Sequence, residues 1–347
     1  MRIAHSRRMN RVFLSFAALL SIVSCGGGGG SPTEPSATSP DPGTVVRGQT
    51  VNAVDGAPAA NLSVRIGGRF PIPTDGSGFF QVDVHNTSAQ RAVIEGSAFV
   101  ERETQMTASA APTRVSMIPK SFDLGAFDEM FRTSNAQLQR WTQRPSLVIL
   151  AAIMEYRNNA STYAATNEQL TEPEIAQLTA HMNEGLAFLT GNTFTSFSSV
   201  EIERPAGGSR VNTMRPGQIV VGRYTGIPSL TKTIGFGQWS EQPDGSIFGG
   251  AMYLDREFDR DDNRRRLLRI HELGHALGYQ HVESRSSIMN PSIGPEPTEF
   301  DRTGAAIAFS RPVGNRSPDV DPSSAVLASV SGEGRWMMPR TKCGDGQ

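Results

Sequence analysis

The order of apolar and polar positions divides the chain into two parts with different periodicities. Between residues 45 and 120, segments such as 62–66 (LSVRI) and 80–84 (FQVDV) alternate apolar and polar side chains. A period of two is typical of strands with one buried face. Asp55-Gly56 and Asp75-Gly76 supply turns between such strands. No helical periodicity is visible here, so we expect a small all-β sandwich.

Buried strands and amphipathic helices are expected in the second part, between residues 121 and 310. Residues 146–151 (SLVILA) and 218–222 (QIVVG) are apolar runs that indicate buried strands. Thr171 is a suitable N-cap for a helix whose apolar positions recur at helical spacing. A second helix is expected over residues 263–277, with leucine and isoleucine side chains on its buried side. The chain is therefore multidomain, with an α+β domain after the sandwich.

The amino terminus has the layout of a secretory signal, predicted at residues 1–24. Four arginines precede an apolar run over residues 12–23, which is too short for a comfortable membrane span. The run ends in Ser24-Cys25, and this junction resembles the lipobox of bacterial lipoproteins. By that resemblance Cys25 carries a lipid anchor, and the protein lies in the bacterial cell envelope outside the cytoplasm. If the cell is Gram-negative, the resemblance places it on the outer membrane or the cell surface. A plain signal peptide cut nearby, with Cys25 incidental, is the alternative.

The composition agrees with a secreted, tethered protein and argues against one class of binding partner. Residues 25–44 are rich in glycine, serine and proline, so we expect a flexible tether there. The net charge of −1 shows no excess of positive charge of the kind that nucleic-acid-binding proteins carry. Only two cysteines are present, Cys25 and Cys343, so a lipidated Cys25 leaves no internal disulfide. Residues 311–347 read as a C-terminal tail, in which only the apolar stretch 325–330 could form a strand.

Residues 271–281 read HELGHALGYQH and hold three of the six histidines of the chain. His271 and His275 lie four positions apart on the expected helix, so both imidazoles can face one metal ion. Gly278 can leave the helix with a positive φ, which returns His281 to the same ion as a third ligand. Three nitrogen ligands and one open position are typical of catalytic zinc. Glu272, beside the first ligand, can reach a zinc-activated water.

A second motif follows at residues 287–291 (SIMNP). A zinc motif of the form HExxHxxGxxH followed by a methionine turn resembles the metzincin metallopeptidases. The spacing from His281 to Met289, with Pro291 after it, resembles the matrixin branch. The resemblance implies an α+β metzincin-type catalytic domain with a twisted mixed sheet, an active-site helix and a Met-turn. It also implies that Met289 lies beneath the zinc ligands as a hydrophobic floor.

The resemblance extends to neighbouring segments. Residues 249–255 (GGAMYLD) are similar to the matrixin strand before the active-site helix, and residues 300–309 to the final helix, where Asp301 is expected to anchor the Met-turn. Family layout places residues 234–239 nearest the cleft, in a strand able to pair with an extended peptide. The first part of the chain resembles carboxypeptidase-regulatory-like and prealbumin-like sandwich modules, for which spacing is the expected role.

These observations predict an extracytoplasmic zinc endopeptidase that cleaves a peptide or protein substrate. His271, His275 and His281 would hold one Zn²⁺, and Glu272 would be the general base. Two other classes stay open. The chain could be a surface binding or adhesion lipoprotein in which the sandwich matters most. It could also be a zinc hydrolase of a non-protein amide, such as one in cell-wall material.

Two further segments of the sequence each allow two interpretations. Four aspartates precede the active-site helix: Asp255, Asp259, Asp261 and Asp262. Matrixins bind structural Ca²⁺ through such oxygens, but interleaved arginines favour a solvated, charged connection. Near the other end, residues 339–345 (PRTKCGD) are similar to the cysteine segment that keeps matrixins inactive. A Cys343 thiolate that reaches zinc is therefore an alternative to a frayed terminus.

Overall fold

The computed structural model describes residues 44–132, 136–156, 163–225, 233–323, 335–337 and 343–344. The predicted signal peptide, Cys25 and nearly all of the tether lie outside these residues, as does the stretch 325–330. Contacts group Pro40–Gln347 into one unit. Among the described residues, none of the helices combines the length and apolar character that a bilayer span needs.

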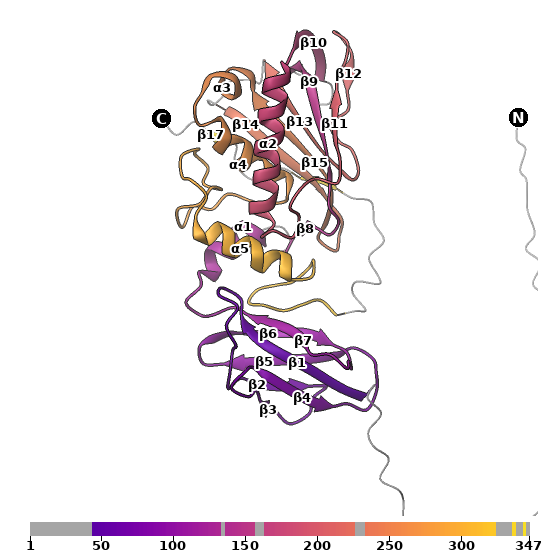
Figure 1. The fold of residues 1–347 in the computed structure, drawn as a ribbon, viewed down its shortest axis with the longest axis vertical. Coiled ribbons are helices and arrows are strands. Elements are labelled where there is room, and N and C mark those ends of the chain that lie inside the picture. Colours follow the sequence, from indigo (N-terminus) through magenta and orange to yellow (C-terminus); the bar gives the residue numbers. More distant parts are fainter. Residues whose placement is uncertain are drawn as a thin grey trace, which may run out of the picture. The chain divides into compact units, whose positions relative to one another are not determined.

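Two small sheets come first along the chain (Figure 1). One has the order β4-β1-β7 and consists of β1 (Val45–Asn52), β4 (Phe79–Asp83) and β7 (Thr113–Met117). The other has the order β3-β2-β5-β6 and consists of β2 (Ser63–Ile66), β3 (Ile72–Pro73), β5 (Gln90–Gly96) and β6 (Phe99–Met106). Strand β1 runs antiparallel to β4 and parallel to β7.

The alternating pattern of this part explains its core. In β2, Val64 and Ile66 are fully buried while Arg65 between them is exposed. Val46 and Phe80 from the first sheet belong to the same apolar cluster. The two sheets therefore bury one shared set of side chains, and the strands expected at 62–66 and 80–84 are confirmed. The specific kind of sandwich module stays a prediction.

A larger mixed sheet follows. It is ten-stranded among the described residues and has the path β12-β10-β9-β13-β15-β14-β16, with β11, β17 and β8 beside it. Strands β9, β13 and β15 run parallel, and β14 runs antiparallel to β15. The bounds are β8 (Arg140–Trp141), β9 (Ser146–Tyr156), β10 (Tyr163–Gln169), β11 (Val200–Glu203), β12 (Arg210–Val211), β13 (Gln218–Thr225), β14 (Thr233–Glu241), β15 (Ser246–Asp255), β16 (Arg335–Met337) and β17 (Cys343–Gly344).

The helices that accompany this sheet are α1 (Leu124–Phe131), α2 (Glu172–Leu189), α3 (Arg256–Asp261), α4 (Arg265–Ala276) and α5 (Glu299–Ser310). Helices α3 and α4 contact its strands, whereas α2 packs on α4 and α5 packs on α2. The helix expected after Thr171 is confirmed as α2, which begins with a capping box between Thr171 and Glu174. The helix expected at 263–277 is confirmed as α4. The sheet and helices together form an α+β arrangement, as the sequence predicts.

Helix α4 lies close to the sheet because glycines face it. It contacts both β14 and β15. A Cβ added at Gly250 would lie 2.9 Å from the carbonyl oxygen of Ala276, and one at Gly237 would lie 2.5 Å from the carbonyl oxygen of Glu272. Any larger residue at these positions would push the helix away. The glycines thus determine how near the zinc motif can approach the sheet.

Three of the four aspartates before α4, namely Asp259, Asp261 and Asp262, form ion pairs. Asp259 in α3 is fully buried and binds Arg269 of α4, with a distance of 2.6 Å from Nε to Oδ1, and Arg223 of β13 at 2.6 Å. Arg269 is also fully buried. The expectation of a solvated connection is therefore wrong at Asp259, because two cations from other elements enclose it. Asp255 instead caps α3 through the amide of Phe258.

Part of the segment after α5 is also built into the fold. Asp319 is fully buried and accepts hydrogen bonds from Arg311 and from Arg102 of β6, the latter at 2.8 Å. Arg311 in turn donates to the carbonyl oxygen of Ser116 in β7. Because a buried charge requires a partner, this cluster ties the first sheets to the chain that follows α5.

The last described residues form strands. Strand β16 pairs with Trp239–Glu241 of β14, and β17 pairs with Thr233 and Gly235 of the same strand. The expectation of a frayed terminus is wrong at Cys343, whose backbone lies opposite Gly235. Nothing in the sequence of this short segment marks it as a strand.

Candidate metal centre

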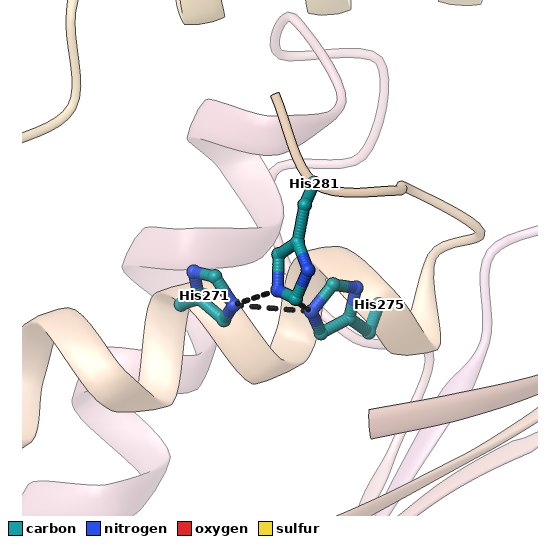
Figure 2. Close-up of side chains that lie close together, drawn as sticks. All are labelled: His271, His275 and His281. Carbon is teal, nitrogen blue, oxygen red and sulfur yellow. Dashed lines mark hydrogen bonds between the residues drawn. The ribbon is translucent and has the colours of Figure 1, made fainter. Parts of the chain in front are cut away.

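Three histidine side chains converge on one point (Figure 2). The Nε2 atoms of His271 and His275 are 3.0 Å apart, those of His275 and His281 are 3.1 Å apart, and those of His271 and His281 are 3.2 Å apart. All three residues are buried. In the part of the chain that the structure describes, these three side chains lie close enough together to share a metal ion. The structure thus brings together the three predicted ligands.

The local backbone explains the convergence. His271 and His275 lie one turn apart on the same face of α4, which ends at Ala276 with Leu277 as the C-cap. Gly278 then adopts a φ of +99°, a conformation that other residues rarely accept. The chain leaves the helix at this point and returns His281 to the first two ligands, as the sequence predicts. A Cβ at Gly278 would also strike the side chain of Ile247.

Hydrogen bonds fix which nitrogen faces the centre. Nδ1 of His271 lies 2.7 Å from the carbonyl oxygen of Ile288, and Nδ1 of His275 lies 2.7 Å from that of Tyr279. A carbonyl oxygen can only accept, so each Nδ1 carries the proton and each Nε2 presents a lone pair. Two lone pairs 3.0 Å apart cannot bond to each other. A cation between them would use both lone pairs.

Burial keeps the imidazoles neutral. Loss of solvent lowers the pKa of His271 to about 3 and that of His281 to about 4. It lowers the pKa of His275 well below the ordinary histidine value as well. Neutral imidazole is the form that binds a metal, so the triad is ready for an ion at neutral pH without first losing protons.

The geometry suits zinc. A tetrahedral Zn²⁺ with bonds of about 2.0–2.1 Å to nitrogen separates two ligand atoms by about 3.3 Å. The observed separations of 3.0, 3.1 and 3.2 Å are close to this value. Three neutral nitrogen ligands, with no fourth ligand side chain beside them among the described side chains, leave one coordination position for water or substrate. The residues present therefore fit a catalytic zinc ion.

Glu272 lies on α4 next to the first ligand and is fully buried. Its carboxylate lies against β14, because a Cβ added at Gly235 would be 2.8 Å from Oε1. Glycine at this position leaves room for the acid between helix and sheet. The side chain next to the first ligand is thus held between α4 and β14.

Met289 lies under the helix. It is fully buried, and a Cβ at Gly274 would collide with its sulfur and lie 2.9 Å from its Cε. The carbonyl oxygen of Met289 accepts a hydrogen bond of 2.9 Å from the amide of Val282, the residue after the third ligand. Met289 thus contacts the helix between the two helical ligands and is bonded to the segment that carries His281.

Asp301 supports this turn from α5. It is fully buried, and it accepts hydrogen bonds from the hydroxyl of Ser287 and from the amide of Ile288, the latter at 3.1 Å. This is the anchoring role expected for Asp301 from its place in the sequence. The carbonyl oxygens of Ile288 and Tyr279 were not predicted, since backbone acceptors leave no mark in a sequence.

Comparison with known proteins agrees with this geometry. Residues 229–304 match the sequence model of a family described as Matrixin. The matched stretch contains the histidine triad, Glu272 and Met289. No curated protein matches the chain. The match and the triad together support a matrixin-like domain and, with it, zinc-dependent peptidase activity.

Proposed function

We propose that the chain is a zinc endopeptidase that hydrolyses peptide bonds with Glu272 as general base. The observation that carries this proposal is the convergence of three Nε2 atoms, two of them on rings whose Nδ1 atoms are bound to carbonyl oxygens. A purely structural site would add a fourth protein ligand. Here His271, His275 and His281 leave a position open.

The chain's own residues supply the remaining chemistry. When bound, zinc would act as a Lewis acid that makes water more acidic and polarises a carbonyl group. Glu272 would accept the proton of the attacking water and pass it to the leaving amine. Its burial excludes bulk water, so the proton stays at the carboxylate between the two steps.

The sheet offers a place for the substrate. Strand β14 contacts α4 and lies at Glu272. An extended peptide can add to such a strand through backbone hydrogen bonds, while side-chain pockets select the sequence. We therefore propose that a peptide lies beside β14 with its scissile bond near Glu272.

A variant series tests this function. Glu272→Gln keeps the size of the side chain but removes the base, so turnover of a quenched-fluorescent peptide library should fall by about 10²–10⁴-fold while zinc stays bound. Glu257→Gln, an exposed carboxylate in α3, is the matched control and should keep full activity. Chelation should abolish cleavage, and added zinc should restore it.

Two results would contradict the proposal. Full activity of Glu272→Gln would show that Glu272 is not the general base. Zinc-loaded protein that cleaves no peptide, but releases amines from cell-wall fragments, would show a hydrolase of non-protein amides instead.

The location is part of the same proposal. A lipid on Cys25 would hold the domain at the outer face of a membrane, on the tether of residues 25–44. Cys25→Ser should move the protein from the membrane fraction to the soluble extracytoplasmic fraction and prevent labelling with a radioactive fatty acid. A protein that stays in the membrane fraction without that cysteine would rule out the anchor.

A further inference from the structure

The strand nearest the metal centre is β14. Gly235 lies against the carboxylate of Glu272, and a Cβ at Gly237 would be 2.5 Å from Cβ of His275. Helix α4 contacts β14 and its neighbour β15. Helix α4 thus lies over these two strands, with Glu272 and His275 against β14.

Both edges of β14 are in use. One edge pairs with β15, from Gly235 opposite Leu254 to Glu241 opposite Ile247. The other edge holds β16 and β17, which both run antiparallel to β14. Trp239 lies opposite Met337, and Gly235 lies opposite Cys343. The C-terminal strands therefore pair with β14 on both sides of residues 236–238.

We infer that β16 and β17 compete within the molecule for the peptide-binding edge of β14 and hold the enzyme in a state of low activity. This inference rests on the proposed function, since it assigns a regulator to the same edge. The backbone N–H and C=O groups of that edge can bond to one added strand at a time. A substrate that pairs with β14 must first displace β16 and β17.

The strength of this competition follows from two opposing facts. Strand β16 makes three residue pairs and β17 makes two, and so short a pairing is marginal by itself. The segment is nevertheless covalently linked to the domain, which gives it an effective concentration in the millimolar range. Competition of this kind raises KM and leaves kcat unchanged, because the segment is absent once the substrate is bound.

Proline substitutions in the full-length chain provide the test. Proline removes a backbone donor and is poorly accepted inside a paired strand. Trp336→Pro and Gly344→Pro should each lower KM for a peptide substrate, together by about ten-fold, with kcat unchanged. Ser323→Pro, at an exposed position that precedes β16 and lies outside the strands, is the control and should leave KM as it is.

Two more measurements separate backbone pairing from a role of the Cys343 side chain. A synthetic peptide of residues 335–347 should inhibit the double proline variant competitively and the full-length enzyme far less. Cys343→Ser should leave KM unchanged, because the pairing uses the backbone. Relief of inhibition by Cys343→Ser alone, or an unchanged KM in the proline variants, would overturn the inference.

Hydrogen exchange keeps this result distinct from a failure of the proposed function. Amides of β14 that face β16 and β17 should exchange slowly in the full-length chain and faster in the proline variants, whether or not a peptide is cleaved. Faster exchange without any peptidase activity would refute the proposed function and the inhibitory role with it. Equal exchange in all variants would show that the strands do not cover this edge.

Discussion

Asp301 and His271 are connected through a single residue. The carboxylate of Asp301 accepts a hydrogen bond from the amide of Ile288, and the carbonyl oxygen of Ile288 lies 2.7 Å from Nδ1 of His271. An acid on α5 therefore orients a metal ligand on α4 without contacting it. Outer partners of this kind fix the ring orientation and the tautomer of a ligand.

The first prediction follows from this connection. Asp301→Ala should release Ser287 and Ile288, so that His271 loses its fixed orientation. We expect zinc affinity to fall by about 10–100-fold, measured by competition with a chromogenic chelator. Glu299→Gln, an exposed acid in the first turn of the same helix, should keep the affinity of the unchanged protein. Equal affinities of the two variants would refute the role of Asp301.

The second prediction concerns whether replacing a helical glycine by alanine raises or lowers the free energy of unfolding. Alanine normally stabilises a helix over glycine by about 1 kcal/mol. Gly125→Ala in α1 should follow this rule, because its added Cβ has no neighbour closer than 3.6 Å. Gly274→Ala in α4 should instead lower the free energy of unfolding, because the new methyl group collides with Met289. Thermal unfolding of the zinc-free proteins measures both, and a more stable Gly274→Ala would show that Met289 does not support the helix at that point.

The third prediction concerns the buried ion pairs of α3. Asp259→Asn removes the negative charge between the buried side chains of Arg223 and Arg269. We therefore expect the free energy of unfolding, measured with urea, to fall by about 3–5 kcal/mol. Asp261→Asn removes an exposed carboxylate of the same helix and should change stability by no more than about 0.5 kcal/mol. A small effect at Asp259 would mean that water reaches the two arginines.

The fourth prediction is a pH dependence at Glu174. Burial favours the neutral acid, but hydrogen bonds from Arg223 and Thr171 outweigh it and lower the pKa of Glu174 to about 2, from an ordinary value of 4.5. Because the unfolded chain binds this proton more tightly, the contribution of Glu174 to stability is present above about pH 4.5 and is lost as the pH falls toward 2. The stability difference between the unchanged protein and Glu174→Gln should shrink over that window. Glu172→Gln on the same helix, an exposed carboxylate, should show no such trend.

The sequence was sufficient to predict those parts of the structure that depend on residues close together in the chain. Thr171 predicted the start of α2, and the eleven residues from His271 to His281 predicted a helix, a turn and a converging triad. Gly278 carried much of that prediction, since glycine is the residue that readily accepts a positive φ. The match at residues 229–304 agrees with the resemblance that Met289 suggested.

Contacts between distant segments could not be read in the same way. Asp259 looked like part of a solvated run because its partners, Arg223 and Arg269, are separated from it in sequence and are polar themselves. Residues 335–337 and 343–344 form strands only because β14 offers an open edge. Backbone pairing of this kind depends on the partner strand more than on local propensity, so the segment gave no signal of its own.

The compact sequence range of the zinc site has a consequence for how the protein is made. His271, Ile288, Met289 and Asp301 belong to one continuous stretch, whereas the surrounding sheet joins strands from residue 140 to residue 344. Contacts of short sequence separation form early, since little chain entropy is lost in closing them. The ligand shell can therefore take shape on a growing chain before the sheet is complete, because β16 and β17 follow it in the sequence.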